Sequence, residues 1–308
     1  MKIIIGASTF AEEDNSPLRL LEGSGAEIIR NPLGRRWNEE ETIRLLEGVD
    51  GLLAGLEPLN RRVLESTRGR LKALARIGIG MNNVDQAAAR ELGIKVSNTP
   101  DAPTLAVAEM TLAALLSLSR DLESMNRAMH SGKWPKQISR SLAELTVLVV
   151  GYGRIGRAVT RNLAAGGCHI LVHDPFLPPG AACEFERISL ETGLAAADVV
   201  SLHTSGDKMI LGDAQFAAAR RGLILLNPSR GELVDEAALI RALESGQVGK
   251  AWLDVFWREP YTGPLLNYPQ VLLTPHASTY TRRCRLSMET EAVVNLLRDL
   301  GLSTASSL

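Results

Sequence analysis

The sequence predicts an α/β protein made of two domains, each built on its own parallel β-sheet. At 308 residues the chain is longer than one hydrophobic core usually serves. Aliphatic residues dominate a hydrophobic fraction of 45%, and aromatic residues contribute only 4%. This composition is typical of helices packed on both faces of buried parallel strands. Short β-branched runs also alternate with amphipathic stretches along almost the whole chain.

Strand-like and helix-like segments alternate through the first third of the sequence. Amphipathic patterns predict helices over residues 38–46 and 84–92, between the strands. Two prolines follow at positions 100 and 103, and then an apolar stretch of roughly seven turns predicts one long helix from Thr104 to about Ser131. This linker and helix mark a domain boundary. The strands expected before it are residues 2–7, 26–30, 51–54, 73–77 and 95–97.

A second alternation follows the long helix and closes with a helix over about 281–300. We therefore expect one domain over residues 99–281 and the other over residues 1–98 plus 282–308, with a ligand cleft between them. The strands expected in this part are residues 146–150, 169–173, 199–203, 223–227, 249–254 and 271–274.

Charge and cysteine content argue against several classes of function. The 34 basic residues balance 35 acidic ones without forming a basic patch, so we expect no nucleic-acid partner. The N-terminal apolar run is too short for a signal peptide or a membrane span. The three cysteines are far apart and form no CxxC motif, so we expect neither a metal site nor disulfides. A cytoplasmic protein that does not bind membranes is the resulting expectation.

The segment "TVLVVGYGRIGRAV" predicts a dinucleotide site in a Rossmann-type domain. Gly151, Gly153 and Gly156 follow an aliphatic strand and open a helix. Glycine is needed there for a tight turn, for close approach to a pyrophosphate and for helix–strand packing. Asp174 ends the next strand, where a carboxylate can accept both ribose hydroxyls and repel a 2′-phosphate. NAD is therefore the predicted cofactor.

Polar residues also end three later strands. They are Arg230 in "NPSRGELVD", Asp254 and Glu259 in "LDVFWREP", and His276 in "TPHAS". An arginine binds a carboxylate with two hydrogen bonds, a histidine exchanges a proton near neutral pH, and a glutamate orients the imidazole. Beside a nicotinamide, this set of residues would interconvert a 2-hydroxy acid and a 2-oxo acid.

Each of these residues, taken alone, has a structural alternative. Arg230 could pair with Glu232 or Asp235 at a helix start. Glu259 could be a solvated loop residue before Pro260, and His276 could be a packed histidine. Only the combination of the motifs favours catalysis.

Taken together, the motifs resemble the D-isomer-specific 2-hydroxyacid dehydrogenases, in their phosphoglycerate dehydrogenase-like branch. The stretch "ARIGIGMNNVDQAAARELGIKVSNTP" is similar to the family's substrate-domain signature. "VAE", "GYGRIG" with "HDP", and the three polar segments follow in the family's order and spacing. The resemblance covers nearly the whole chain and implies two Rossmann/flavodoxin-like domains, a substrate-binding domain and an NAD-binding domain.

The resemblance also implies a role for individual residues. Arg230 would bind the substrate carboxylate, His276 would exchange the proton, and Glu259 would pair with His276 and raise its pKa. Asp254 would bind the nicotinamide carboxamide. Backbone N–H groups at Gly78, Ile79 and Gly80 would hold the substrate carboxylate from the other domain. Residues implied for the cofactor site beside the glycines and Asp174 are Arg154, Ile155, His203 and Thr204.

The substrate itself stays open at this stage. Where phosphoglycerate enzymes often have an Arg-Ser pair, this chain has "AGLEPLNRR" at residues 54–62. Arg61, Arg62 or Arg76 could substitute for the missing arginine. Candidate substrates are 3-phosphoglycerate, glyoxylate or hydroxypyruvate, and larger 2-oxo acids. Alternative functions are an NAD-sensing corepressor-like binding protein and a phosphite or phosphonate dehydrogenase. The resemblance further implies a homodimer packed through the long helix.

Overall fold

The structure is a computed structural model that describes residues 1–178, 180–206 and 208–303. The chain divides into two compact units. The first unit contains residues 1–103 and the chain from Tyr280 onward, and the second contains Thr104–Thr279. Residues 304–308, at the end of the predicted range 282–308, lie outside the described part. Among the described residues, no helix combines the length and the apolar character that crossing a bilayer requires.

The first unit is built on a five-stranded sheet in the order β2-β1-β3-β4-β5, and every strand pair in it is parallel. All five strands fall within the ranges that the sequence predicts. Each is three or four residues long. The strands are β1 (Lys2–Ile5), β2 (Glu27–Ile29), β3 (Gly51–Ala54), β4 (Ala73–Arg76) and β5 (Lys95–Ser97).

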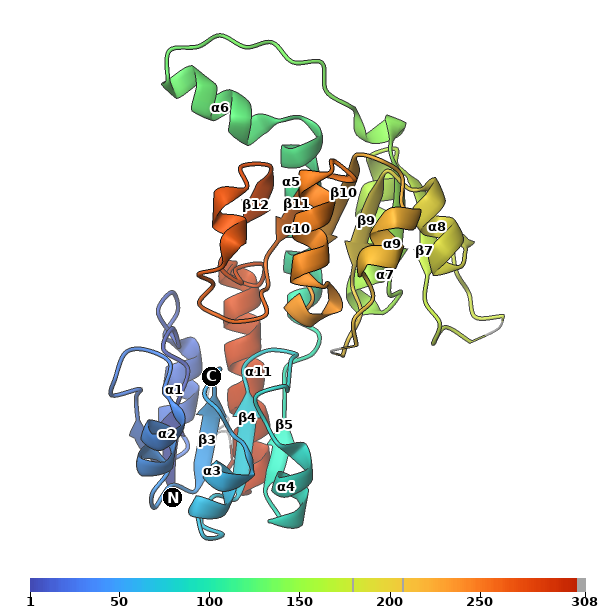
Figure 1. Cartoon of the computed structure of the whole chain (residues 1–308). Coiled ribbons are helices and arrows are strands. Elements are labelled where there is room, and N and C mark those ends of the chain that lie inside the picture. Colours follow the sequence, from blue (N-terminus) through green and yellow to red (C-terminus); the bar gives the residue numbers. More distant parts are fainter. Residues whose placement is uncertain (179, 207, 304–308) are drawn as a thin grey trace. The chain divides into compact units, whose positions relative to one another are not determined.

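Helices cover both faces of this sheet. On one face α2, α3 and α4 close a core around Leu52 and Leu74. On the other face α11 packs along β3 and β4 (Figure 1), so closely that a Cβ on Gly51 would come within 2.7 Å of Leu300. The side chain of Thr281 caps the start of α11 by accepting a hydrogen bond from the backbone of Cys284. The helices are α1 (Ser16–Glu22), α2 (Glu39–Leu45), α3 (Arg61–Ser66), α4 (Gln86–Glu91) and α11 (Arg282–Leu300).

The second unit is built on a seven-stranded parallel sheet in the order β12-β11-β10-β9-β6-β7-β8. Alternate side chains of β6 enter different cores: Leu148 and Val150 face one, and Val147 and Val149 face the other. Because all strands run the same way, their carboxyl ends lie on one edge of the sheet. The strands are β6 (Thr146–Val150), β7 (His169–His173), β8 (Glu186–Arg187), β9 (Val199–Leu202), β10 (Leu223–Asn227), β11 (Val248–Leu253) and β12 (Val271–Leu273).

Helices α8, α9 and α10 supply one of these cores, and α5 and α7 supply the other. Short 3-10 turns join several of the elements. The helices and turns are α5 (Pro103–Ser119), α6 (Leu122–His130), α7 (Arg154–Ala165), α8 (Leu190–Ala196), α9 (Asp213–Ala218), α10 (Glu236–Glu244), η1 (Leu142–Glu144), η2 (Gly231–Leu233) and η3 (Pro264–Asn267). The two-residue edge strand β8 has no counterpart among the predicted strands, because two charged residues carry no apolar signal.

The prediction of one long helix from Thr104 to about Ser131 is wrong. The helix breaks after Ser119, and Asp121 has a left-handed backbone with φ +54°. Lys250 stabilises the break, because its ammonium group contacts the Asp121 carboxylate and the Leu118 carbonyl, each at 2.7 Å. Asp tolerates the left-handed conformation better than most residues. The apolar pattern continues across the break, so it does not reveal the change of direction.

Helix α6 and the segment that follows it extend beyond one end of the second unit's sheet and do not cover its faces (Figure 1). No side chain of α6 is buried. Several apolar residues of α6 and the following segment are exposed: Leu122, Met129, Trp134 and Ile138. An amphipathic helix that buries no residue stands out in a unit whose other long helices all supply core residues.

Candidate active site

The polar residues predicted from the last third of the sequence lie on three adjacent strands. Arg230 follows β10, Glu259 follows β11 and His276 follows β12, all at the carboxyl edge of the second unit's sheet. Gly231 lets the Arg230 loop approach the β11 loop, since a Cβ at this position would lie 2.3 Å from the Phe256 carbonyl carbon. Because β10, β11 and β12 are adjacent and parallel, the segments that follow them lie next to one another at the same edge of the sheet.

Arg230 is half-buried, and hydrogen bonds to the residues just before it hold it in place. The Asn227 side-chain amide donates to the Arg230 carbonyl at 2.8 Å, and the Arg230 guanidinium donates to the Ser229 carbonyl at 2.5 Å. Burial lowers the pKa of Arg230, while the charges of Glu232 and Glu259 oppose that shift. A partly desolvated guanidinium binds an oxyanion more strongly than a fully hydrated one does.

His276 and Glu259 form a pair. The imidazole Nδ1 lies 3.0 Å and 3.1 Å from the two carboxylate oxygens of Glu259. The same carboxylate accepts the backbone N–H of Phe256 at 3.2 Å. The two side chains are 38% and 27% exposed, so the imidazole remains accessible from outside. With Nδ1 bound to a carboxylate, Nε2 is the ring atom that can exchange a proton with a substrate.

Asp254 fixes the segment that carries His276. Its carboxylate is buried and accepts three hydrogen bonds, from the Thr274 hydroxyl at 2.5 Å and from the backbone N–H groups of Ala277 and Ser278 at 2.9 Å. Trp252, buried in the sheet, donates in turn to Thr274 at 2.9 Å. These bonds surround His276, whose own backbone is left-handed with φ +53°. Asp254 therefore positions the histidine loop, a contribution that the sequence motif does not indicate.

The glycine-rich turn after β6 has the geometry that a pyrophosphate requires. Gly151 has φ +97°, and a Cβ there would lie 2.6 Å from the His203 carbonyl. A Cβ on Gly156 would lie 2.0 Å from the Gly151 carbonyl oxygen, so this glycine allows α7 to pack on the turn. Gly153, at the N-terminus of α7, faces open space. These three environments match the three tasks of glycine in a dinucleotide site.

Asp174 lies at the end of β7, next to the glycine turn. Its carboxylate accepts the backbone N–H groups of Tyr152 and Phe176 at 2.8 and 2.9 Å. These bonds hold the carboxylate in place and keep it half-buried beside the turn. Of the two residues expected between the glycines, Arg154 is exposed at the first position of α7 and Ile155 packs on the core.

His203 and Thr204 border the same turn. The His203 Nε2 pairs with the Ser201 hydroxyl at 2.7 Å, and burial lowers the pKa of His203 to about 3. Its Nδ1 and the Thr204 hydroxyl are buried and have no hydrogen-bond partner among the described residues. The Ser278 hydroxyl, next to the histidine loop, is in the same condition. Buried polar groups of this kind normally have a partner, so these atoms fit a polar cofactor bound at this edge.

Gly78, Ile79 and Gly80 belong to the first unit, after β4. The Gly78 N–H donates to the Thr99 hydroxyl at 2.8 Å, and Asn98 donates to the Ile79 carbonyl at 2.8 Å. The expected anion-binding backbone is therefore reduced to the N–H groups of Ile79 and Gly80. Gly78 has φ +130°, which explains why the turn requires a glycine.

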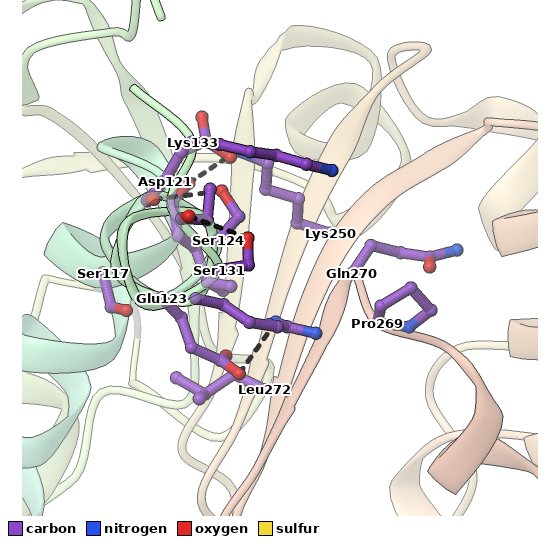
Figure 2. Close-up of a pocket in the computed structure, with 13 residues that line it drawn as sticks. Ser117, Asp121, Glu123, Ser124, Ser131, Lys133, Lys250, Pro269, Gln270 and Leu272 are labelled. Atoms are coloured by element: carbon purple, nitrogen blue, oxygen red, sulfur yellow. Dashed lines mark hydrogen bonds and ion pairs between the residues drawn. The ribbon is translucent and has the colours of Figure 1, made fainter. Parts of the chain in front are cut away.

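A groove of about 620 Å³ lies elsewhere in the second unit, between the α5–α6 break and β12 (Figure 2). Its walls include Arg127, Lys133, Lys250 and Gln270, and none of the predicted site residues lines it. Lys250 and Gln270 lie toward the amino ends of β11 and β12. The groove is thus separate from the candidate active site. In the described part of the chain, no cluster of three His, Cys, Asp or Glu residues has a geometry suited to a metal ion.

Sequence reasoning missed several supporting residues. Ser201, Thr274 and Asn227 hold His203, Asp254 and the Arg230 loop respectively. Each is a polar residue in or beside an apolar strand, as in "VVSLH" and "VLLTPH". A polar residue in a strand buried on both faces must find a hydrogen-bond partner, and this signal could have identified them.

Comparisons with known proteins agree with this description. A model of the D-isomer specific 2-hydroxyacid dehydrogenase NAD binding domain matches residues 112–278. D-3-phosphoglycerate dehydrogenase 3, chloroplastic, of Arabidopsis thaliana is 39% identical over 259 residues, which are 80% of this chain and 44% of that protein. The chain spans about half the length of the curated relatives it matches.

Solved structures match over almost the whole chain. A protein of Thermus thermophilus is 33% identical, with a TM-score of 0.88 and 99% of each chain covered. A glyoxylate reductase from Paecilomyes thermophila is 28% identical, with a TM-score of 0.84, and the match covers 96% of this chain and 93% of that one. The predicted fold class and NAD as cofactor are confirmed, and the chain belongs to the D-isomer specific 2-hydroxyacid dehydrogenase family.

Proposed function

We propose that the protein is an NAD-dependent oxidoreductase that interconverts a D-2-hydroxy acid and its 2-oxo acid by hydride transfer. The observation that carries this proposal is the Glu259–His276 pair, with Nδ1 bound to the carboxylate, at the ends of β11 and β12 beside the strand β10 that carries Arg230. NAD bound at the glycine turn would accept the hydride in the oxidation, and NADH would donate it in the reduction. Side chains of this protein carry out the remaining steps.

In the proposed reduction, Arg230 binds the substrate carboxylate with its guanidinium and polarises the neighbouring carbonyl. His276 donates a proton from Nε2 to the carbonyl oxygen as the carbonyl carbon is reduced. Glu259 holds the opposite ring nitrogen and stabilises the charged imidazole while it carries the proton. In the oxidation, His276 removes the hydroxyl proton through the same atom.

Binding of the substrate carboxylate by Ile79 and Gly80, and of the nicotinamide carboxamide by Asp254, belongs to the same proposal. We also propose that His203 and Thr204 contact the cofactor. The His203 Nδ1 and the Thr204 hydroxyl, which are buried without a hydrogen-bond partner among the described residues, support these contacts. A cytoplasmic location also remains a proposal, which the three free cysteines, Cys168, Cys183 and Cys284, favour.

The test is oxidation of NADH with a panel of 2-oxo acids, followed by absorbance. Arg230→Ala and His276→Ala should each lower kcat/KM by about a thousandfold, because each removes a group that meets the reacting substrate. Arg44→Ala and His169→Ala are matched controls, since both residues are exposed, Arg44 lies in the first unit, and His169 lies at the amino end of β7, opposite the edge that carries the site. Equal activity of all four variants would contradict the proposal.

Tight NADH binding without turnover of any 2-oxo acid would instead favour one of the alternatives. Turnover of phosphite or a phosphonate under the same conditions would identify a dehydrogenase for those anions. Absence of turnover on every compound would favour the NAD-sensing corepressor-like role. The fold accommodates all three functions, so the choice depends on the site chemistry.

We also propose a homodimer. The exposed apolar residues of α6 and the segment after it support this, because an apolar surface of this kind is normally covered. Light scattering should give twice the 33.3 kDa chain mass. The double variant Trp134→Ser with Ile138→Ser should dissociate the dimer, and a monomeric native protein would refute the proposal.

A further inference from the structure

The loop that follows β11 and carries Glu259 packs on the chain segment that follows β10. The Trp257 indole Nε1–H donates to the Val234 carbonyl, just after η2, at 2.7 Å. Phe256 and Val234 are buried in the same core, and Trp257 packs against it. The backbones also meet, because a Cβ on Gly231 would lie 2.5 Å from the Trp257 nitrogen. The loop with Glu259 is therefore fixed to the segment after the neighbouring strand.

Tyr261, two residues after Glu259, makes a further contact between these segments. Its hydroxyl donates to the carboxylate of Glu236, in the first turn of α10, at 2.5 Å, and accepts the backbone N–H of Leu265 at 3.1 Å. Its ring stacks on Phe256 with 4.6 Å between the ring centroids. Burial and the Glu236 hydrogen bond raise the pKa of Tyr261 to about 12, so the hydroxyl keeps its proton near neutral pH. Two hydrogen bonds and a stacking contact thus hold this side chain in place.

The loop makes room for the Tyr261 side chain at Gly263. A Cβ on Gly263 would lie 2.4 Å from the Tyr261 hydroxyl oxygen and 2.6 Å from a ring carbon. The φ of Gly263 is −84°, which residues other than glycine adopt freely, so the backbone conformation does not require a glycine here. The space that the tyrosine occupies does require one.

Phe256 connects Tyr261 to Glu259. The Phe256 ring stacks on Tyr261, and its backbone N–H donates to a carboxylate oxygen of Glu259 at 3.2 Å. The same carboxylate contacts Nδ1 of His276 at 3.0 and 3.1 Å. The chain neighbours of Glu259 on both sides are exposed. The position of the carboxylate therefore depends on the packed part of the loop, which Tyr261 attaches to α10.

We infer that Tyr261 is a positioning residue for the proposed reaction, because it holds the loop on α10 and so keeps the Glu259 carboxylate against His276. This inference rests on the proposed function, since it concerns the proton transfer assigned to His276. A displaced carboxylate favours the charged imidazole less, so the proton needed for reduction is lost at lower pH. Arg230, which interacts with the charges of both Glu259 and Glu232, stays protonated throughout this range.

The test measures reduction of the best 2-oxo acid by NADH as a function of pH. Tyr261→Phe keeps the stacked ring and removes the hydroxyl. We expect kcat at about pH 7 to fall about tenfold. The pH above which kcat/KM falls below half its maximum should move down by about half a pH unit, and Glu259→Gln sets the largest displacement that loss of the carboxylate charge can cause. NADH affinity should not change, because the glycine turn follows β6, three strands away from β11.

Tyr268→Phe is the matched control. The Tyr268 hydroxyl donates to Glu244 at 2.8 Å, and Glu244 is the last residue of the helix α10 that Glu236 begins. This control should change kcat by less than about twofold and leave the pH profile in place. Gly263→Ala keeps the Tyr261 hydroxyl but pushes the side chain aside, so it should reproduce the effect of Tyr261→Phe on kcat and on the pH profile.

The double variant Tyr261→Phe with Glu259→Gln decides whether the tyrosine acts through the glutamate. If it does, the pH profile of the double variant coincides with that of Glu259→Gln alone. A further displacement in the double variant would overturn the inference and leave the proposed function intact. So would a Tyr261→Phe or Gly263→Ala protein with the kcat and pH profile of Tyr268→Phe. Absence of turnover of every 2-oxo acid by the native protein would overturn the proposed function, and this inference with it.

Discussion

Replacing Asp254 with asparagine tests whether this carboxylate holds the histidine loop. Asparagine has nearly the same shape but supplies one acceptor oxygen in place of two. If that oxygen takes the place of Oδ1, it keeps the bonds from Thr274 and Ala277, and the amide then points a donor at the Ser278 N–H, where 2.9 Å now separates Oδ2 from the nitrogen. The opposite orientation loses two bonds instead of one, so it is worse.

The cost follows from these contacts. One hydrogen bond to a charged acceptor is lost, and one buried N–H is left facing another donor, which together amount to about 2–4 kcal/mol. Because Asp254 is only 1% exposed, water cannot compensate for the lost bond. The loop on which His276 lies would shift to relieve the clash, so kcat should fall about tenfold to a hundredfold.

Urea denaturation gives the free energy of unfolding, and NADH fluorescence titration gives cofactor affinity separately from turnover. A matched variant is Asp213→Asn, whose carboxylate is 70% exposed in a surface pair with Arg241 and should cost less than about 1 kcal/mol. A change in unfolding free energy below about 0.5 kcal/mol for Asp254→Asn, with unchanged kcat, would refute the positioning role.

Three further predictions concern the second unit. The pKa of His203 lies near 3 in the folded protein, below its ordinary value of 6.5, so the unfolded chain binds the proton first and stability falls as the pH drops from about 6.5 toward 3. Between about pH 7 and about pH 4.5, the free energy of unfolding should fall by about 2–3 kcal/mol more in the native protein than in His203→Gln, as measured by urea denaturation at both pH values. An equal fall in both proteins would contradict the burial of a neutral imidazole. Arg230→Lys should lower kcat/KM for the best 2-oxo acid by about a hundredfold with little change in NADH affinity, because an ammonium group cannot bind a carboxylate with two parallel bonds; a change below about threefold would exclude bidentate binding. Asp121→Ala should lower the unfolding free energy by about 1–2 kcal/mol, and Asp121→Gly should lower it by less. Both variants lose the Lys250 pair, but only glycine tolerates the left-handed backbone. The reverse order would show that the backbone conformation does not determine the difference in stability.

The sequence predicts the repeating parts of this fold well, because buried parallel strands leave a strong apolar signal. The ranges of β1, β6 and β10 follow directly from runs of Ile, Leu and Val. The same signal fails at the α5–α6 break, where apolar residues continue while the chain turns at Asp121. Local apolarity reports burial, but the turn depends on Lys250, which lies more than a hundred residues away.

For the candidate site, strand ends and residue chemistry predict the Glu259–His276 contact, and the resemblance assigns its role. What they do not predict is which hydrogen bonds each polar group makes. Asp254 was expected to face the nicotinamide, and its carboxylate already accepts three bonds from residues 274–278. Gly78 was expected to offer its N–H to a substrate and donates it to Thr99 instead. Such pairings depend on side-chain positions that no spacing rule encodes.

The three-residue strand β12 has a consequence for how the protein loses activity. It lies at the edge of the seven-stranded sheet and pairs with β11 over only three residue pairs, from Ala251–Val271 to Leu253–Leu273. His276 follows it closely in the chain. A short edge strand opens by fraying at a much lower free energy than the central strands require. Amide hydrogen exchange should therefore be faster at Leu272 and Leu273 than at Leu225 in β10. Mild heating should then abolish proton transfer while the nucleotide-binding half of the sheet still binds NADH.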